Sequence, residues 1–180
     1  MKKKIKLLVV ADMLIPYTGI TKFLFEVLPR MKEFDITVAY PEKERKLKIK
    51  DIKEAIFPYN FKVFELPIVD VSKRGKLKKL AEKADIVWVQ FISPLSILAI
   101  NYSKRYNKKV VAFLHIFEDE IFHAKALLPF KFLKFGVRTI AKRYYNKCDT
   151  VIVPAKNVGM KIKDIGIKPK QKIVPLGVNI

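Results

Sequence analysis

The residues best suited to acid–base chemistry lie together between positions 115 and 120. His115 follows an apolar run, and Glu118, Asp119 and Glu120 come shortly after it. A histidine beside carboxylates can hold a hydroxyl group and take up or release its proton. Acidic residues are equally favoured in the first turn of a helix, where they face the positive end of the helix dipole. We therefore predict a functional role for His115 and leave the carboxylates open between these two interpretations.

A second candidate site follows the first apolar run of the chain. Residues 12–20 form a loop that places Gly19 at the start of a helical pattern. Backbone N–H groups and the helix dipole at such a start attract an anion. The loop has neither the GxGxxG pattern nor the Walker A pattern, which argues against dinucleotide and P-loop sites. Thr18 and Gly19 are therefore candidates for contact with a phosphate, and a simple turn glycine is the alternative.

A third candidate is a long basic stretch. No acidic residue occurs between Ile121 and Cys148. Four of the basic residues in this stretch share one stripe of a helix: Lys131, Lys134, Arg138 and Lys142. One interpretation is a surface that docks on anionic lipid, where each cation gains about 1 kcal/mol. The other is an ordinary helix whose basic side faces water.

Composition narrows the class of partner. The chain of 180 residues has 37 Lys and Arg against 17 Asp and Glu, which gives a net charge of +20. Such a balance predicts an anionic partner, such as a phosphate group or a lipid surface. No RNA-binding or zinc-finger pattern is present, so nucleic acid is not the partner we expect. The 51% of hydrophobic residues argues for an ordered core.

Cysteine and histidine usage bears on cofactors and location. The one cysteine, Cys148, excludes an internal disulfide and fits a reducing compartment. One cysteine and two histidines do not make a closed zinc site. No run reaches the roughly 18 apolar residues of a membrane-spanning helix, and no cleavage site follows the basic amino terminus. We expect a cytoplasmic protein that contacts the inner face of the membrane peripherally.

Strand and helix patterns alternate along the chain. Apolar runs predict strands over residues 5–11, 36–40, 61–66, 86–91, 110–115, 150–153 and 173–175. Helical patterns occupy residues 19–33, 76–83, 94–106, 118–146 with a break near Pro129, and 156–165, and the charged segment 41–56 is also predicted to be helical. This order predicts one Rossmann-like α/β domain of three layers, with a mostly parallel sheet of six or seven strands. Ligands bind such sheets at the carboxyl ends of the strands.

Four segments, taken together, carry a family resemblance. They are residues 11–20 with Pro16 and Gly19, residues 84–90 beginning Ala84-Asp85, residues 110–115 ending in His115, and residues 148–153 followed by 172–179. In order and spacing they resemble the N-terminal domain of family 4 retaining glycosyltransferases. The resemblance covers nearly the whole chain.

The resemblance implies one half of a GT-B fold, in which two Rossmann-like domains enclose a cleft. The activity it implies is transfer of a sugar from a nucleotide-sugar donor to a sugar or lipid-linked acceptor without a metal ion. It also implies roles for individual residues. His115 would be catalytic beside the transferred sugar, Thr18 and Gly19 would contact the donor phosphate, and the acceptor would lie near Gln90, Phe91, Glu118 and Asp119.

The sequence departs from the family pattern in places. Thr18 stands where the first glycine of a pair is expected, and Gln90 stands where a histidine is frequent. The acidic pair of the donor-binding half is absent. We therefore expect residues 1–180 to be the acceptor-side domain, to lack the C-terminal donor-binding domain, and to be inactive alone. The alternative is a free-standing Rossmann-like domain that binds a nucleotide or nucleic acid without catalysis.

Overall fold

The computed structural model describes residues 3–12, 19–42, 49–63, 66–115 and 131–175. Within these residues, seven parallel strands form one sheet in the order β3-β2-β1-β6-β7-β8-β9. The strands are β1 (Ile5–Val10), β2 (Phe34–Pro41), β3 (Lys53–Phe57), β6 (Ile86–Val89), β7 (Lys109–Phe113), β8 (Thr150–Val153) and β9 (Lys170–Ile173). The prediction of a parallel α/β sheet of six or seven strands is confirmed, with β1 paired on both sides.

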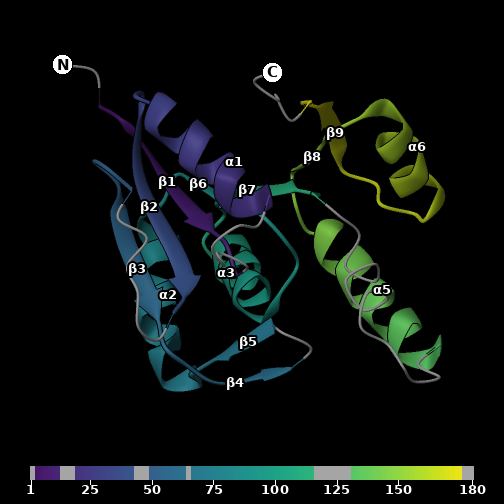
Figure 1. The fold of residues 1–180 in the computed structure, drawn as a ribbon, viewed down its shortest axis with the longest axis horizontal. Helices are drawn as coiled ribbons and strands as arrows, with labels where there is room; N and C mark the ends of the chain where they lie inside the picture. The colour runs from purple at the N-terminus through teal and green to yellow at the C-terminus, as the bar shows by residue number, and fades with distance from the viewer. Residues whose placement is uncertain (1–2, 13–18, 43–48, 64–65, 116–130, 176–180) are drawn as a thin grey trace.

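Helices cover both faces of this sheet (Figure 1). They are α1 (Gly19–Val27), α2 (Arg74–Lys83), α3 (Pro94–Arg105), α5 (Lys131–Tyr145) and α6 (Lys156–Asp164). Side chains of a strand alternate between the faces, so β1 contributes to two cores. Leu7 and Val9 pack with Leu24 of α1, whereas Leu8 and Val10 belong to the core that α2, α3, α5 and α6 build on the other face.

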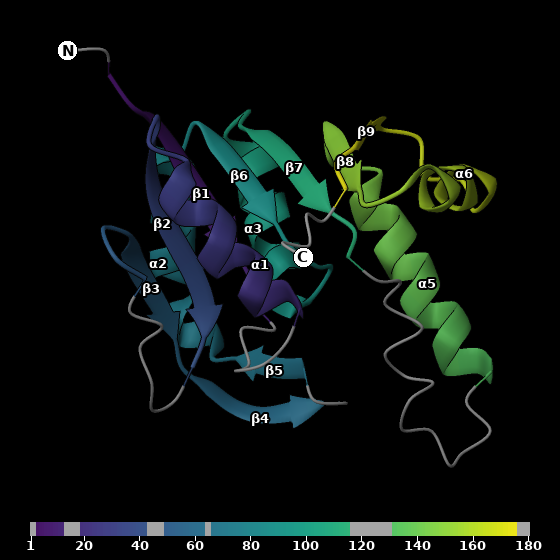
Figure 2. The same ribbon diagram turned by 45° about the horizontal axis from the view of Figure 1, so that its top comes forward.

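A smaller antiparallel pair lies outside the main sheet. It consists of β4 (Tyr59–Val63) and β5 (Leu66–Val69). Figure 2 shows this pair beyond the end of β2, on the side of the sheet toward which the strand arrows point. The predicted strand over 61–66, ended by Pro67, is therefore wrong in its bounds, because Pro67 lies inside β5 opposite Lys62. A two-stranded sheet leaves one side of each strand unpaired, and a proline is tolerated there.

Two further predictions need correction. Part of the segment 41–56, predicted as helix, forms β3, because Ala55 and Phe57 are buried beside β2. The last strand is β9 at Lys170–Ile173 rather than residues 173–175. Most of β9 is exposed, so it lacks the apolar run by which a strand is recognised. Of the helix predicted over 118–146, residues 118–130 lie outside the described residues and α5 forms the rest.

The end of α6 depends on one glycine. Gly166 has a φ of +84°, and its N–H donates to the carbonyl of Lys163. The N–H of Ile167 donates to the carbonyl of Ile162, and both isoleucine side chains are buried. This pair of bonds is a Schellman motif, which needs a left-handed residue after the helix. Gly166 thus turns the chain from α6 into the edge of the sheet.

We predict that Gly166→Ala lowers the free energy of unfolding by about 1 kcal/mol, because a Cβ is disfavoured at positive φ. Gly136→Ala is the matched control, since it lies inside α5 and an added Cβ there meets no atom within 4 Å. That change should raise stability by about 0.5–1 kcal/mol. Urea titrations followed through the single tryptophan, Trp88, measure both. Equal effects of the two substitutions would contradict the assignment.

Candidate functional site

The order of the strands reverses beside β1. From β1 the chain moves outward to β2 and β3, and it then returns to place β6 on the other side of β1. In open parallel sheets, ligands bind at the carboxyl ends of the strands at such a switch point. Asp12 follows β1, Gln90 follows β6 and His115 follows β7. The polar residues of these three strand ends therefore meet at one edge of the sheet.

His115 is held in a mostly aromatic environment. Its ring stacks on Phe113, with 4.2 Å between centroids and an interplanar angle of 15°. Phe23 of α1 packs edge-on against the same imidazole with centroids 5.2 Å apart. Burial lowers the pKa of His115 to about 4, because the charged form loses its hydration. His115 is therefore a neutral imidazole at neutral pH.

Gln90 contacts His115 directly. The side chain of Gln90 is completely buried, and its Oε1 lies 2.8 Å from Nε2 of His115. The other end of the amide, Nε2 of Gln90, is buried without a hydrogen-bond partner among the described residues. A buried donor without a partner costs about 1–3 kcal/mol. No hydrogen bond within the described residues offsets this cost for Nε2 of Gln90.

Asp12 joins the loop after β1 to the loop after β6 at this edge of the sheet. Its Oδ2 accepts hydrogen bonds from the hydroxyls of Ser93 and, at 3.2 Å, Ser96. Ser93 is the N-cap of α3 and accepts the N–H of Ser96 at 3.2 Å. Burial raises the pKa of Asp12 to about 6, although the serine hydroxyls and the backbone amides at the start of α3 act against the shift. Asp12 thus fixes the loop after β6 to the loop after β1.

The structure places the other predicted site residues as follows. Gly19 is the first residue of α1 and is exposed, and an added Cβ meets no atom of the described residues within 4 Å. Phe91 is 1% exposed, so its side chain is part of the core. Arg138 and Lys142 are exposed on α5, which also contains Lys131 and Lys134. Thr18, Glu118 and Asp119 lie outside the described residues.

Part of this site, namely the hydrogen bonds of Asp12 and the packing around His115, could not be predicted from the sequence patterns used above. Asp12 belongs to the loop predicted after the first strand, but its hydrogen bonds with Ser93 and Ser96 and the contact of Phe23 with His115 were not predicted. A carboxylate directly after a doubly buried strand is a signal that could have been used, since such a position is desolvated and needs donors. The bond between Gln90 and His115 joins residues 25 positions apart and depends on the pairing of β6 with β7.

The described residues also bear on the requirements of a metal site and of a reactive thiol. No group of three His, Cys, Asp or Glu side chains that could hold a metal ion occurs in the described part of the chain. Cys148 is buried, and burial raises the pKa of its thiol to about 12. The thiol is therefore protonated at neutral pH and packs as a small apolar group.

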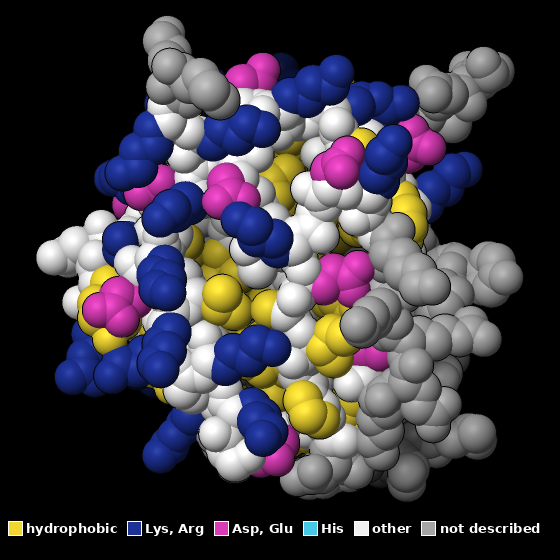
Figure 3. Space-filling model, turned by 90° about the vertical axis from the view of Figure 1, so that its left-hand side faces the viewer, with side chains coloured by type: hydrophobic (Ala, Val, Ile, Leu, Met, Phe, Trp, Pro, Cys, Tyr) yellow, Lys and Arg dark blue, Asp and Glu magenta, His cyan; other side chains and the backbone are white. Residues whose placement is uncertain are grey.

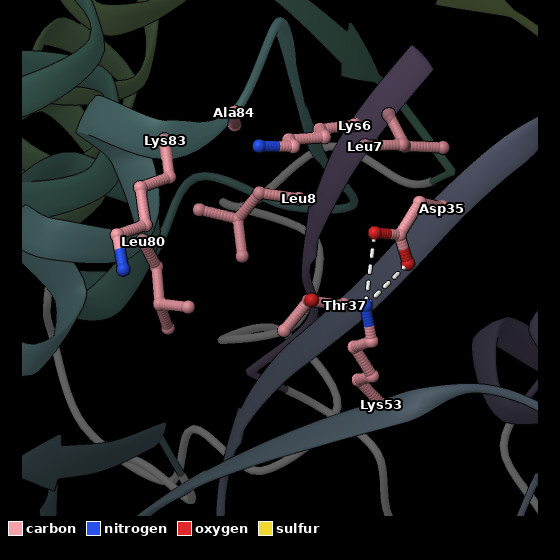
Figure 4. A pocket seen from close by; sticks show the side chains of 9 residues that line it. All are labelled: Lys6, Leu7, Leu8, Asp35, Thr37, Lys53, Leu80, Lys83 and Ala84. Carbon is pink, nitrogen blue, oxygen red and sulfur yellow. Dashed lines mark hydrogen bonds and ion pairs between the residues drawn. The ribbon is translucent and has the colours of Figure 1, made fainter. Parts of the chain in front are cut away.

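A cavity of about 200 Å³ lies at the opposite edge of the sheet. Figure 4 shows its lining, which comes from the amino-terminal parts of β1, β2 and β3 and from the end of α2. Lys53 crosses it to form an ion pair with Asp35 at 2.7 Å. Figure 3, which looks toward the β3 edge, shows Lys and Arg side chains around apolar ones that reach the surface. This cavity is at the other end of β1 from Asp12 and is not part of the switch-point site.

Comparison with known families supplies the identification. The family model described as Glycosyltransferase Family 4 matches residues 18–180. The chain belongs to this family. The predicted resemblance is therefore confirmed. No curated protein sequence gives a significant match.

Solved structures share the fold at low sequence identity. HepE from Anabaena, solved with UDP and glucose, is 13% identical with a TM-score of 0.64, over 97% of this chain and 45% of that one. Sucrose-phosphate synthase from Thermosynechococcus elongatus is 8% identical with a TM-score of 0.61, over 98% and 49% of the two chains. A UDP-N-acetylglucosamine 2-epimerase is 16% identical with a TM-score of 0.62, over 95% and 48%. The chain spans about half the length of these proteins.

We predict that Asp12→Asn removes a pH dependence of stability. The pKa of Asp12 is about 6 in the folded state against 3.8 for an aspartate in water, so the folded protein binds more protons between these values. The free energy of unfolding should therefore fall as pH rises from about 4 to 6, by on the order of 2 kcal/mol. The Asn variant, which does not titrate, should lack this loss. Urea titrations at pH 4, 5, 6 and 7 measure the difference.

Asp149→Asn is the control of opposite sign. Although burial acts in the other direction, hydrogen bonds from Lys104 and the backbone of Val110 lower the pKa of Asp149. The stability that Asp149 contributes is present above its unfolded pKa and is lost as the pH falls. Parallel pH profiles for wild type and the Asp12 variant would contradict the role given to Asp12.

Proposed function

We propose that the protein is the acceptor-side half of a glycosyltransferase that transfers a sugar from a nucleotide-sugar donor to an acceptor. The observation that carries the proposal is the family match over residues 18–180, together with the polar switch-point site. The family and fold neighbours give no support to the alternative of a free-standing nucleotide- or nucleic-acid-binding domain. The neighbours include an epimerase, so the fold by itself does not select the reaction.

The proposed division of labour follows from the site. Gly19 begins α1 at the carboxyl edge, where its exposed N–H can donate to a donor phosphate. His115 faces the same edge as a neutral imidazole and can hold a sugar hydroxyl. Thr18 completes the phosphate contact, and Gln90, Glu118 and Asp119 belong to the acceptor side. The side chain of Phe91 is buried, so it would support the acceptor side only by packing in the core. A C-terminal domain would bind the rest of the nucleotide-sugar.

We propose further that transfer retains the anomeric configuration and needs no metal or cofactor. The leaving diphosphate would then be stabilised by backbone N–H groups and by the helix dipole of α1, which act where negative charge develops. Separate production of the two halves should leave this chain without turnover, because the phosphate would be bound from one side alone.

Sugar transfer is tested with a panel of radiolabelled UDP- and GDP-sugars and with sugar and lipid-linked acceptors. The chain is assayed alone and together with a donor-binding half, with and without EDTA. Labelled product that forms with both halves and survives EDTA supports the proposal, and NMR of its anomeric proton reports retention. Absence of product from every donor, or release of an epimerised nucleotide-sugar, would overturn the proposed reaction.

We predict that Gly19→Val lowers turnover by at least tenfold while the free energy of unfolding changes little. Among the described residues no atom lies within 4 Å of an added Cβ, so the valine side chain meets no described neighbour, but it would occupy the space of a phosphate at the start of α1. Gly75→Val is the matched control, because Gly75 lies in the first turn of α2 with equal room. Loss of turnover in both variants, or in neither, would contradict a phosphate role for Gly19.

The proposed acceptor is membrane-borne, and the protein is proposed to be cytoplasmic with peripheral contact to the inner face of the membrane. No helix in the described residues is long and apolar enough to cross a membrane. Support comes from α5, whose amino-terminal end extends away from the sheet in Figures 1 and 2. Phe135 on α5 is 74% exposed, Ile140 is exposed as well, and Arg138 lies one turn from Phe135. Exposed apolar side chains beside cations suit an anionic lipid interface.

We predict that the protein sediments with vesicles that contain anionic lipid and that salt weakens this binding. Changing Lys131, Lys134, Arg138 and Lys142 to serine should reduce binding at least tenfold, because each cation contributes about 1 kcal/mol near the leaflet. The matched control changes Lys43, Lys46, Lys48 and Lys50 to serine. Equal losses in the two variants would mean that the net charge of +20, and not α5, attracts the lipid.

A further inference from the structure

Three contacts restrict the imidazole of His115. The face of the ring lies on Phe113, its edge meets Phe23 of α1, and its Nε2 lies 2.8 Å from Oε1 of Gln90. The two aromatic contacts limit rotation of the ring, but they do not distinguish one nitrogen from the other. The contact with Gln90 distinguishes the two ring nitrogens, because an amide oxygen is an acceptor and needs an N–H opposite it.

We propose that Gln90 is a positioning residue that fixes His115 as the Nε2–H tautomer and leaves Nδ1 as an acceptor for a ligand hydroxyl. In a neutral imidazole, a hydrogen bond at one nitrogen decides which nitrogen carries the proton. Nε2–H donates to Gln90 Oε1, so Nδ1 keeps its lone pair. The identity of the ligand rests on the proposed function, whereas the tautomer and the ring orientation do not.

The burial of Gln90 makes it suited to this role. Its side chain is completely buried, so water does not compete for Oε1. An amide carries no charge and does not titrate, so it orients the imidazole without favouring the imidazolium, as a carboxylate at this position would. Gln90 therefore keeps His115 both oriented and neutral. The backbone of Gln90, which directly follows β6, is fixed as well, because its N–H donates to the carbonyl oxygen of Val10 of β1 at 3.0 Å.

The unpartnered end of the amide agrees with this assignment. Nε2 of Gln90 has no hydrogen-bond partner among the described residues. Because the amide is buried, a ligand at this edge would meet the partly exposed imidazole, where Nδ1 of His115 could accept a hydrogen bond from a ligand hydroxyl. A polyhydroxylated ligand such as a sugar offers such a group.

The tautomer is measured by NMR of protein labelled with ¹⁵N in its imidazoles. The chain has two histidines, so the spectrum of His123→Gln assigns His115. At pH 7 we expect Nε2 of His115 to be protonated and Nδ1 to be unprotonated. Gln90→Leu and Gln90→Met, which keep a side chain of similar size without an acceptor oxygen, should lower the Nε2–H fraction. Gln90→Glu should restore it, because a carboxylate accepts from the same nitrogen.

Phe23→Leu is the matched control, since it loosens the packing around the imidazole but leaves the Gln90 bond in place; its tautomer should be that of wild type. Two results overturn the proposal: an Nδ1–H tautomer in wild type, or an Nε2–H fraction that is unchanged in both the Leu and the Met variants. Where Gln90→Leu fails to fold, the Met variant gives the same information.

A kinetic readout links the tautomer to catalysis. Gln90→Leu should lower kcat on the order of tenfold, and the loss should be absent on a His115→Ala background, because residues that act as a unit are not additive. Equal losses on both backgrounds would overturn the positioning role. If no sugar transfer is found at all, the proposed function is wrong. The NMR measurement needs no substrate, so it tests the tautomer of His115 independently of the proposed function.

Discussion

Parallel pairing of β1 with β6 is the constraint on which the rest of the site depends. Because the strands point the same way, the loop after β1 and the loop after β6 emerge at one edge, although Asp12 and Ser93 are 81 positions apart in the sequence. The hydrogen bond from Ser93 to Asp12 then joins these loops and sets the start of α3. The neighbouring pairing of β6 with β7 brings Gln90 and His115 together in the same way.

The chemistry of this edge contrasts with the surface of the protein. The surface is strongly basic, with a net charge of +20, and attracts anions over distances of the order of the Debye length, about 10 Å. The described side chains around His115 are neutral or aromatic instead. Under the proposed function, a nucleotide-sugar would be attracted by the charge of the whole molecule and oriented by a few uncharged hydrogen-bonding groups. In such an arrangement the direction of hydrogen bonds, rather than ion pairing, would select the sugar.

Most strands of the sheet could be predicted from the sequence, because a strand that is buried on both faces is a continuous run of apolar residues. Residues 5–11 and 150–153 are of this kind; the structure confirms the first strand as Ile5–Val10, one residue shorter, and the second with the predicted bounds. Strands that are partly exposed carry no such run. β3 lies within a charged segment, so the segment 41–56 was wrongly predicted as helix. β9 is mostly exposed, so the last strand was wrongly predicted at residues 173–175.

The site could be predicted only in part from the sequence. His115 and Gly19 were identified as candidates because His115 ends a strand pattern and Gly19 begins a helix pattern, and Gln90 was identified through the family resemblance. Their partners could not be identified in this way. The contact of Phe23 with His115 depends on how α1 lies across the sheet, and the bond of Asp12 with Ser93 depends on strand order. Both are properties of tertiary packing that no local pattern contains.

The mostly exposed strand β9 has a consequence for how copies of the protein behave toward one another. In the described residues β9 ends the sheet, and the backbone groups on its free side are able to pair with a strand of another molecule. Lys170 and Lys172 alternate along it and are exposed. A second copy added at this edge would bring its own lysines alongside them, and like charges on adjacent strands repel. Repulsion between these lysines should therefore oppose edge-to-edge pairing of two copies. Salt screens the repulsion, so the tendency to pair should increase as the salt concentration is raised.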